Sequence, residues 1–309
     1  MAILSILSIV VLVGMITETF AQAAISQCSN LSSGTYVLDA NVVSATDTCF
    51  TVEGHNVVLD GANNTLTGPG SGKGIYNSRY DNFTVKNFAN ITNFQTHIFI
   101  RAAKNATIRN NTLHATNKGA RPVRTSNTTL TTIANNTIMI QGDHSQAIFV
   151  FRSFTSTITN NTINTTNDGS NSILNILSET SNISNNTIST AGENSQGIAD
   201  TVSSESTIAG NIVSATRINS VNIHVFNSTR ATILNNSLTT LQSNSPTINV
   251  FASTGTSISN NALTTLGVSR SIGIITIRRP NAQNRTLPTL NGNNINTQRA
   301  RDRTKNITT

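Results

Sequence analysis

The sequence has few of the residues with which globular proteins usually build aromatic cores and charged surfaces. Its 309 residues include no tryptophan, and aromatic residues make up only 5% of the chain. Charged residues make up 11%, whereas soluble domains average about 25%. This scarcity of charge excludes a surface held together by many ion pairs, and it indicates a surface of Thr, Ser and Asn side chains.

The positive charge that is present gathers towards one end of the sequence. The chain has 20 Lys and Arg against 13 Asp and Glu, which gives a net charge of +7, and eight of the 20 lie after residue 269. Proteins that bind nucleic acid carry a continuous basic stripe, so we predict no nucleic-acid partner. Binding to an anionic polysaccharide or to lipid headgroups fits this distribution better.

A pair of asparagines recurs every 25 residues, and three apolar positions recur with the same period, as at Ile148, Ile158 and Ile163. Short runs of β-branched residues that are split by Asn and Gly favour strands. A fixed period of this length indicates stacked structural repeats. The sequence therefore predicts an all-β fold, a β-solenoid of about ten coils of about 25 residues, with three parallel sheets. The pair occupies Asn110-Asn111, Asn135-Asn136, Asn160-Asn161, Asn185-Asn186, Gly210-Asn211, Asn235-Asn236 and Asn260-Asn261.

The second residue of each pair falls at one point of every coil. Asn tolerates the left-handed backbone conformation of a sharp bend, and its amide can donate to the next Asn when strands stack about 4.8 Å apart. We expect this column to form both the bend and an asparagine ladder, and two serine columns to mark the other two turns. The ladder residues are Asn111, Asn136, Asn161, Asn186, Asn211, Asn236 and Asn261; the serine columns contain Ser145, Ser170 and Ser195, and Ser153, Ser178 and Ser203.

Two other repeats of this length are less consistent with the sequence. A helical repeat would need good helix formers, whereas Asn, Thr and Ser are poor ones. A leucine-rich repeat would need the L-x-x-L-x-L pattern, which the chain lacks.

The first residues are typical of an export signal. An apolar run from Ile3 to Met15 precedes Ala21-Gln22-Ala23, which offers a cleavage site, so we predict a signal peptide over residues 1–24. The run is too short to span a membrane, and no transmembrane segment is expected after cleavage. Export to the cell surface, the medium or the periplasm favours a disulfide between Cys28 and Cys49. The cysteines lie roughly one coil apart, and the bridge would contribute about 3 kcal/mol.

The segment Val57 to Gly68 and the later Ile-x-Asn-Asn-Thr-Ile copies resemble secreted right-handed parallel β-helix proteins of the pectin-lyase-like superfamily. The resemblance covers about residues 28–295, and it implies a right-handed parallel β-helix domain over residues 25–295. Members of the family include polysaccharide lyases and hydrolases, surface adhesins and periplasmic repeat proteins. Residues 296–309 are basic and polar without apolar residues to join a core, so we predict a disordered tail.

In that family, ligands bind along the outer face of the first parallel sheet. We assign this sheet to the strands that begin at the column of Ile98, Ile148 and Ile173. Strand alternation then points aromatic and basic side chains outward, where the rings could stack on sugars, or where a loop or the tail could cover them. A polysaccharide or a cell-surface glycan is the expected partner. The predicted substrate-binding residues are Arg101, Arg124, Phe149, Phe151, Phe226 and Phe251.

Two polar residues near this face are candidates for catalysis. Asp200 falls in an inward column, where a carboxylate is costly unless it is paired. Either the strand is bulged and Asp200 faces outward, or Asp200 is buried with a raised pKa. His224 lies one coil further on, so an outward Asp200 could form an acid–base pair with it. The alternative is an internal hydrogen bond or a surface ion pair.

Three acidic residues share one turn column, namely Asp143, Asp168 and Glu193. Stacked carboxylates repel one another unless solvent or a cation intervenes. Ca²⁺ takes several oxygen ligands and could bridge two of the three, although turns often contain Asp for conformational reasons alone. No cofactor is required by any motif.

Recognisable catalytic motifs are missing from the sequence. Glycoside hydrolysis generally needs two carboxylates across a groove, and no Asp-Asp pair or Gly-His-Gly motif is present. We therefore predict a secreted or surface-associated protein that binds carbohydrate or a cell surface. The alternatives are a polysaccharide lyase or glycoside hydrolase that acts in the groove of the first sheet, and an ice- or mineral-ordering surface, for which only one threonine column is present. Unpaired strand edges at the ends could also permit end-to-end self-association.

Overall fold

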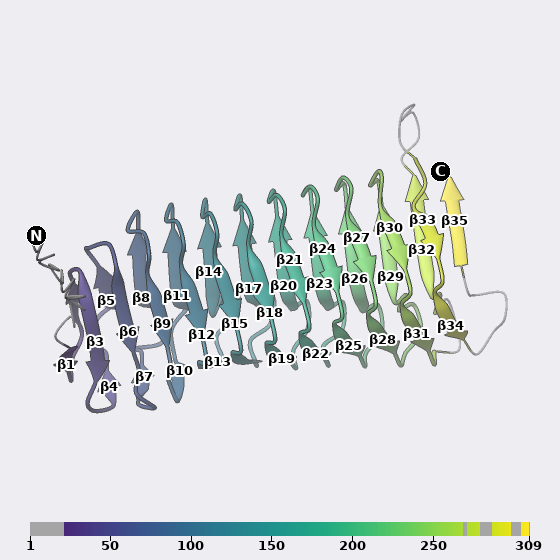
Figure 1. Ribbon diagram of the computed structural model, residues 1–309. Coiled ribbons are helices and arrows are strands. Elements are labelled where there is room, and N and C mark those ends of the chain that lie inside the picture. The colour runs from purple at the N-terminus through teal and green to yellow at the C-terminus, as the bar shows by residue number, and fades with distance from the viewer. Residues whose placement is uncertain (1–21, 268–270, 279–285, 298–303, 309) are drawn as a thin grey trace, which may run out of the picture.

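The computed structural model describes residues 22–267, 271–278, 286–297 and 304–308, and every regular element among them is a β-strand. The strands form three parallel sheets, here called A, B and C, and the chain passes through them in the order A, C, B. Eleven such coils follow the two strands at the N-terminus, and Figure 1 shows them stacked in a row from one terminus to the other. The predicted three-sheet β-solenoid is confirmed.

The strands are short and have similar lengths within each sheet. Sheet A contains β1 (Gln22–Ile25), β3 (Gly34–Leu38), β6 (Val57–Asp60), β9 (Thr84–Lys86), β12 (Thr107–Arg109), β15 (Thr132–Ala134), β18 (Thr157–Thr159), β21 (Asn182–Ser184), β24 (Thr207–Ala209), β27 (Thr232–Leu234), β30 (Ser257–Ser259) and β33 (Thr289–Asn291). Sheet C contains β4 (Val42–Val43), β7 (Thr65–Thr67), β10 (Asn90–Thr92), β13 (Thr112–Ala115), β16 (Thr137–Ile140), β19 (Thr162–Thr165), β22 (Thr187–Thr190), β25 (Ile212–Ala215), β28 (Ser237–Thr240), β31 (Ala262–Thr265) and β34 (Asn294–Thr297). Sheet B contains β2 (Ser29–Leu31), β5 (Thr48–Val52), β8 (Lys73–Ser78), β11 (Thr96–Arg101), β14 (Val123–Ser126), β17 (Gln146–Phe151), β20 (Asn171–Ile176), β23 (Gln196–Thr201), β26 (Val221–Phe226), β29 (Ile248–Phe251), β32 (Ile274–Arg278) and β35 (Thr304–Thr308).

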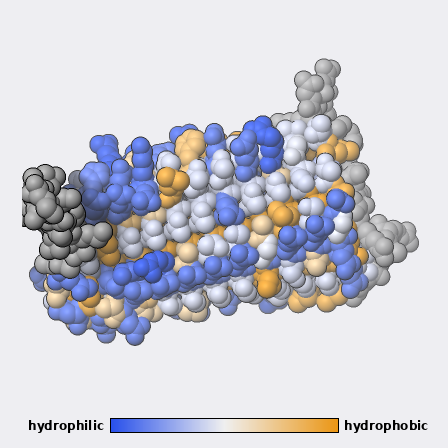
Figure 2. Space-filling view, in the orientation of Figure 1, coloured by the Kyte–Doolittle hydropathy of each residue, from blue (hydrophilic) through white to orange (hydrophobic). Residues whose placement is uncertain are grey.

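The core is a narrow strip of stacked aliphatic side chains between the sheets. Ile158 of sheet A pairs with Ile133 and Ile183 on the neighbouring coils, and each of these side chains is fully buried. Burial of one aliphatic side chain contributes roughly 1.5–3 kcal/mol. The outer surface is much less apolar. Much of the side seen in Figure 2 is pale, near the middle of the hydropathy scale, as the low content of charged residues predicts.

The two residues of the asparagine pair have different tasks. The second one forms the ladder: Asn161 is 1% exposed, and its Nδ2 donates to Asn186 Oδ1 at 3.0 Å and to Ile133 O at 2.9 Å. The first one adopts the left-handed conformation, with φ of 55° at Asn160 and 64° at Gly210. The ladder is confirmed, but the prediction that the same residue makes the bend is wrong. Gly suits the left-handed slot and has no amide side chain for the ladder, which explains Gly210 before Asn211.

The ladder ends differently at the two ends of the array. Towards the C-terminus it continues from Asn261 to Asn293 Oδ1 at 2.9 Å, and Gly292 takes the left-handed slot with φ of 60°. Towards the N-terminus, the backbone N–H of Phe88 donates to Asn111 Oδ1 at 3.2 Å, and the Phe88 side chain is 2% exposed. The coil of β9 and β10 therefore packs an aromatic ring at a corner where the later coils use amides.

Two serine ladders satisfy the backbone at the other corners. The N–H of Ser170 donates to Ser195 Oγ, and the N–H of Ser178 donates to Ser203 Oγ, each at 3.3 Å. All four serines are buried. Buried polar groups are costly unless they are hydrogen-bonded, so these ladders allow tight corners without loss of backbone hydrogen bonds. The predicted serine turns are confirmed.

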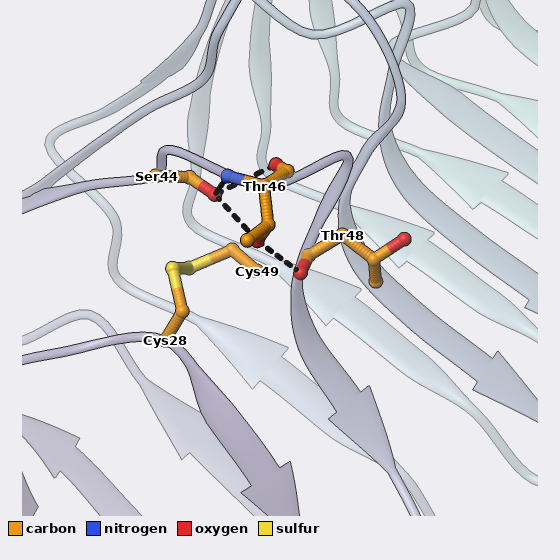
Figure 3. The surroundings of a disulfide bond; sticks show 5 residues. All are labelled: Cys28, Ser44, Thr46, Thr48 and Cys49. Carbon is orange, nitrogen blue, oxygen red and sulfur yellow. Dashed lines mark hydrogen bonds between the residues drawn. A yellow bond between two sulfur atoms is a disulfide. The ribbon is translucent and has the colours of Figure 1, made fainter.

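The predicted disulfide is present at the N-terminal end (Figure 3). Cys28 directly precedes β2 and Cys49 lies in the adjacent β5, with a Cα–Cα distance of 4.5 Å. In the loop that leads to Cys49, Ser44 Oγ donates to Thr46 O and Thr46 Oγ1 donates to Thr48 O, both at 2.9 Å. The bond therefore joins neighbouring coils, as the spacing of the two cysteines predicts.

Both predicted terminal segments lie partly outside the described residues. Of the predicted signal peptide, residues 1–21 fall outside, and residues 22–24 belong to β1, which pairs with β3. Of the predicted tail, residues 298–303 and 309 fall outside, whereas β34 reaches Thr297 and β35 pairs with β32. Signal cleavage stays a prediction, and the array extends beyond residue 295. Within the described part of the chain, no helical segment has the length and apolar character of a membrane span.

Candidate functional site

The outer face of sheet B presents three columns of side chains along the array. Parallel pairing in register stacks like positions of successive strands. Alternation sends two positions of each strand outward, such as Phe149 and Phe151, and a third outward position, such as Gln146, lies three residues before the first of them. The predicted inward column is confirmed, since Ile100, Val150 and Val225 are fully buried. We call the outward columns entry, central and exit, in strand direction. The entry column contains Lys73, Thr96, Arg121, Gln146, Asn171, Gln196 and Val221; the central column Tyr76, Phe99, Arg124, Phe149, Leu174, Ala199, His224 and Asn249; and the exit column Ser78, Arg101, Ser126, Phe151, Ile176, Thr201, Phe226 and Phe251.

In the strands β8 to β17, basic side chains lie over aromatic rings. The guanidinium carbon of Arg124 lies 4.5 Å from the ring centroid of Phe99, and that of Arg121 lies 4.7 Å from the ring centroid of Phe149. Both rings are only 9% exposed. A cation over the face of a ring is attracted by its quadrupole, so each contact also holds the guanidinium in place. We call this region the basic half, defined by Lys73, Arg101, Arg121, Arg124 and Arg152.

The cations of the basic half have no carboxylate partner among the described residues. The two salt bridges there are Lys86–Asp60 and Arg230–Glu205, both elsewhere. The sequence contains no Asp or Glu between Asp81 and Asp143. Burial lowers the pKa of the Arg124 guanidinium, and the positive charges of Arg121 and Arg101 lower it further. The basic half is therefore an uncompensated cluster of positive charge.

In the strands β20 to β29, the same columns carry apolar side chains instead. The rings of Phe226 and Phe251 stack at 5.5 Å with 11° between their planes, and His224 lies edge-on to Phe226 at 6.1 Å. We call this region the apolar half, defined by Leu174, Ile176, Ala199, Phe226 and Phe251. A shallow depression of about 430 Å³ lies beside it, and it is lined by Asn219, Val221, Asn244, Pro246, Asn249 and Ile275.

The structure does not bring Asp200 and His224 together on one face. Asp200 points inward and is fully buried, whereas His224 belongs to the outward central column and is half-buried. In the register of β23 and β26, Asp200 pairs with Val225, and His224 pairs with Ala199. The strand is not bulged, so the pleat places the two side chains on opposite sides of the sheet. The acid–base pair expected from the sequence has no geometric basis.

Asp200 instead belongs to a buried polar cluster. Asn175 Nδ2 donates to Asp200 Oδ1 at 2.7 Å, and Ser206 Oγ donates to the same oxygen at 2.9 Å. Asp200 Oδ2 has no partner among the described residues. Burial raises the pKa of Asp200, which is the second of the two arrangements predicted from the sequence. Gln196 Nε2 lies 2.8 Å from His224 Nδ1, and burial lowers the pKa of that histidine.

The three acidic residues of the turn column are not gathered around a common point. Asp143 and Asp168 are exposed, and Asp168 Oδ1 accepts a hydrogen bond from the backbone N–H of Glu193 at 2.8 Å. Among the residues that the structure describes, no group of three or more His, Cys, Asp or Glu is placed to hold a metal ion. The predicted calcium site thus gains no support from the positions of these side chains.

Sequence reasoning found Arg101 and Arg124 but missed most of the basic half. Lys73 and Tyr76 lie in a coil that is 23 residues long, since Ile75 pairs with Ile98, so a strict period of 25 skips them. Arg121 and Arg152 lie just outside strands β14 and β17. The signal that could have found the cluster is the acid-free stretch between Asp81 and Asp143.

Comparison with protein families identifies one match. Residues 51–267 match the family described as "Periplasmic copper-binding protein (NosD)", and the match covers 217 of the 309 residues. No curated protein has a sequence significantly similar to this chain.

Several solved structures share the fold. PfbA, a surface adhesin of Streptococcus pneumoniae, is 13% identical with a TM-score of 0.50 over 82% of each chain. A DFA-IIIase variant from Arthrobacter chlorophenolicus A6 in complex with DFA-III is 14% identical with a TM-score of 0.54, over 78% of this chain and 62% of that one. A further structure of DFA-IIIase is 11% identical with a TM-score of 0.55, over 83% and 75%. At these identities the likeness shows the parallel β-helix fold alone.

Proposed function

This chain belongs to the NosD family, and from that premise we propose that it is an exported β-solenoid that binds a carbohydrate chain along the outer face of sheet B. The description of the family as periplasmic and the predicted signal peptide both support a location outside the cytoplasm. The adhesin and the DFA-IIIase share only the fold, so the choice of ligand rests on the face itself.

The observation that carries the proposal is the stacked pair of Phe226 and Phe251 in the exit column. Their rings are nearly parallel, with 11° between them, and both side chains are half-buried with part of each ring at the surface. Successive positions along a column lie about 4.8 Å apart, so the columns form a regular strip parallel to the long axis. A strip of aromatic and polar groups suits an extended chain whose sugars have one apolar face.

Copper does not fit the residues that are present. Copper prefers thiolate, thioether and imidazole ligands, and both cysteines are in the disulfide. His114 and Met139 pair across β13 and β16, but His114 Nε2 lies 3.1 Å from Gln141 Oε1. Among the described residues, no three His, Cys, Asp or Glu side chains are grouped to hold a metal ion. We therefore derive no copper chemistry for this chain.

No observation favours catalysis on this face. The outward columns of sheet B from β8 to β29 contain no Asp or Glu, whereas glycoside hydrolysis generally uses two carboxylates across the bound sugar. Asp200, the acidic residue proposed from the sequence, lies on the inner side of the sheet. Binding is thus the function that the geometry supports best.

Polysaccharide pull-down with the full chain tests the proposal. Wild type, Phe226→Ala with Phe251→Ala, and the control Ile212→Ala would be assayed against a panel of insoluble and immobilised polysaccharides. Ile212 is 56% exposed on sheet C, so its substitution removes apolar surface away from sheet B. We expect the double variant to lose at least about 1.4 kcal/mol, or tenfold in affinity, and the control to bind as wild type does. Unchanged binding by the double variant would contradict the proposal.

A further inference from the structure

Resting on the proposed function, we infer that the basic half of sheet B is an anion-binding subsite, centred on Arg124, that takes the carboxylate or sulfate group of an acidic glycan. The subsite joins three guanidinium groups from neighbouring coils. Arg124 lies in the central column, Arg121 in the entry column of the same coil, and Arg101 in the exit column one coil nearer the N-terminus.

Arg124 is held in place before any ligand arrives. Its guanidinium lies between two rings, at 4.5 Å from the centroid of Phe99 and 5.9 Å from that of Phe149. Its Nε atom is buried and has no hydrogen-bond partner within the described residues. A planar guanidinium presents its donors in a fork that matches carboxylate and sulfate oxygens. A fixed fork loses less rotamer entropy on binding than a mobile one.

Arg121 is oriented by a different contact. Its Nε donates to Gln146 Oε1 at 2.8 Å, and its guanidinium carbon lies 4.7 Å from the centroid of Phe149. Gln146 comes from the next coil, so the side chain of Arg121 is tied to the same ring that supports Arg124. The remaining donors of both guanidinium groups are available to one anion near Phe149.

Electrostatics point to an anion because the nearby carboxylates are absent or engaged. Asp81 Oδ1 accepts a hydrogen bond from the backbone N–H of Lys104 at 2.8 Å, and the sequence has no further acid until Asp143. Like charges in proximity repel, as the effect of Arg121 and Arg101 on the pKa of Arg124 indicates. An anionic ligand would relieve this repulsion, and its contribution would decrease at high salt.

The continuation of the columns favours a glycan over other polyanions. Arg124 and His224 are four coils apart in one column, which is about 19 Å at the strand spacing, and Phe226 lies beside His224. A ligand that spans both halves must carry charged groups at one end and apolar faces at the other. A nucleic acid would need cations along its whole length, whereas the outward columns of sheet B from β20 to β29 contain no Lys or Arg.

The experiment compares one polymer with and without its charge. The affinity of the full chain for polygalacturonate, for a sulfated dextran and for carboxyl-reduced polygalacturonate would be measured at about 0.1 M and about 1 M salt, which shortens the Debye length from about 10 Å to about 3 Å. The variants are Arg121→Gln with Arg124→Gln, and the control is Arg109→Gln with Arg217→Gln, which removes the same charge from sheet A and from another corner.

We expect the variant of Arg121 and Arg124 to bind at least one of the two acidic polymers at least tenfold more weakly, with a smaller salt dependence, and to bind the reduced polymer as wild type does. The control should bind as wild type does. A preference for polygalacturonate or for sulfated dextran identifies the anionic group. Arg124→Lys, which keeps the charge but loses the fork, should fall between wild type and Arg124→Gln, and equal unfolding midpoints exclude misfolding as the cause.

The contrary outcomes separate this inference from the proposed function. If wild type binds the acidic and reduced polymers equally, and the arginine variant has no effect, the anion subsite is wrong while carbohydrate binding stands. If wild type binds no polysaccharide, the proposed function fails as well. If only phosphatidylserine vesicles or duplex DNA bind in an Arg124-dependent way, the cluster serves a membrane or a nucleic acid, and the inference is overturned.

Discussion

The basic half and the apolar half of sheet B share one backbone and differ in what the strands carry. Between β8 and β17, guanidinium groups cover the rings of Phe99 and Phe149. Between β20 and β29, the rings of Phe226 and Phe251 stack on each other in the exit column. Register and alternation are identical in both halves. The ladders therefore fix the position of each side chain, so that substitutions in the outward columns can change the surface chemistry without changing the fold.

A buried titratable residue also lies beneath each half, a histidine in one case and an aspartate in the other. His97 lies fully buried in β11 below the basic half, and burial lowers its pKa to about 3. Asp200 lies fully buried in β23 below the apolar half, and burial raises its pKa. Both groups are favoured in their neutral forms. A falling pH should therefore destabilise the basic half, because His97 takes up a proton. A rising pH should destabilise the apolar half, because Asp200 loses one.

The largest effect is expected at His97 in acid. The unfolded chain takes up a proton near the ordinary histidine pKa of about 6.5, and the folded chain only near pH 3. The contribution of neutral His97 to the free energy of unfolding is fully present above about pH 6.5. It decreases by about 1.4 kcal/mol per pH unit as the pH falls towards 3. His97→Leu has no group that titrates in this range. The free energy of unfolding of this variant, relative to that of wild type, should therefore be about 3 kcal/mol larger near pH 4 than near pH 7. Urea unfolding of both proteins at the two pH values measures the difference.

A constant difference between His97→Leu and wild type across this range would show that His97 takes up its proton in the folded state as readily as in the unfolded chain. Hydrogen exchange gives a second readout, because the loss of protection in acid should be largest in β11 and its neighbours.

A broken rung of the ladder tests whether the halves depend on a shared scaffold. Asn161 follows β18, between the two halves, and its Oδ1 accepts from both the N–H and Nδ2 of Asn136 at 3.0 Å. Asn161→Ala leaves the buried N–H of Asn136 without its acceptor and removes the Nδ2 donor to Ile133 O. Each unsatisfied group costs roughly 1–3 kcal/mol, so we expect a loss of about 2–3 kcal/mol. Asn160→Gly is the control, because Gly accepts the φ of 55° with a change below about 1 kcal/mol. Equal urea midpoints for the two variants would contradict the division of tasks within the pair.

The smallest effect is expected at Asp200, as the pH rises above about 3.8. Because the folded pKa is raised, the stabilising contribution of the bound proton is complete below about pH 3.8 and is lost as the pH rises through the folded pKa. Asp200→Asn keeps an acceptor for Asn175 and cannot ionise. Its free energy of unfolding should increase relative to that of wild type as the pH rises from 4 to 8, with unchanged polysaccharide binding. Loss of polysaccharide binding with an unchanged fold would instead show that Asp200 contributes to the binding site.

The fold was predictable because stacking converts sequence period into spatial contact. Ile158, Ile163 and Ile148 each identify a sheet, and Asn161 identifies the ladder, without knowledge of any long-range contact. The exchange of tasks within the asparagine pair was missed because both residues are usually Asn. Only Gly210-Asn211 separates the two requirements, since Gly has the backbone freedom but no amide.

The site was less predictable because its members follow no single period. Tyr76 and Phe99 are 23 residues apart, whereas Phe99 and Arg124 are 25 apart, so the cluster crosses a change in coil length. Lys73 and Arg121 come from an outward column that the strand pattern alone did not suggest. Alternation puts Asp200 in an inward column, but the sequence leaves open whether a bulge turns it outward. Ser206 reaches it from beyond the next corner, which no column analysis shows.

The position of the disulfide makes the two ends of the solenoid unequal in their resistance to unfolding. A stack held by neighbour contacts can unravel from either end, one strand after another. The bond between Cys28 and Cys49 ties β2 to β5, so these two strands cannot separate while it is intact, and the chain has no other cysteine. Within the described array, fraying is then expected to begin at the opposite edge, among β33, β34 and β35. A protease that cuts frayed strands would then be expected to reach the apolar half before the basic half.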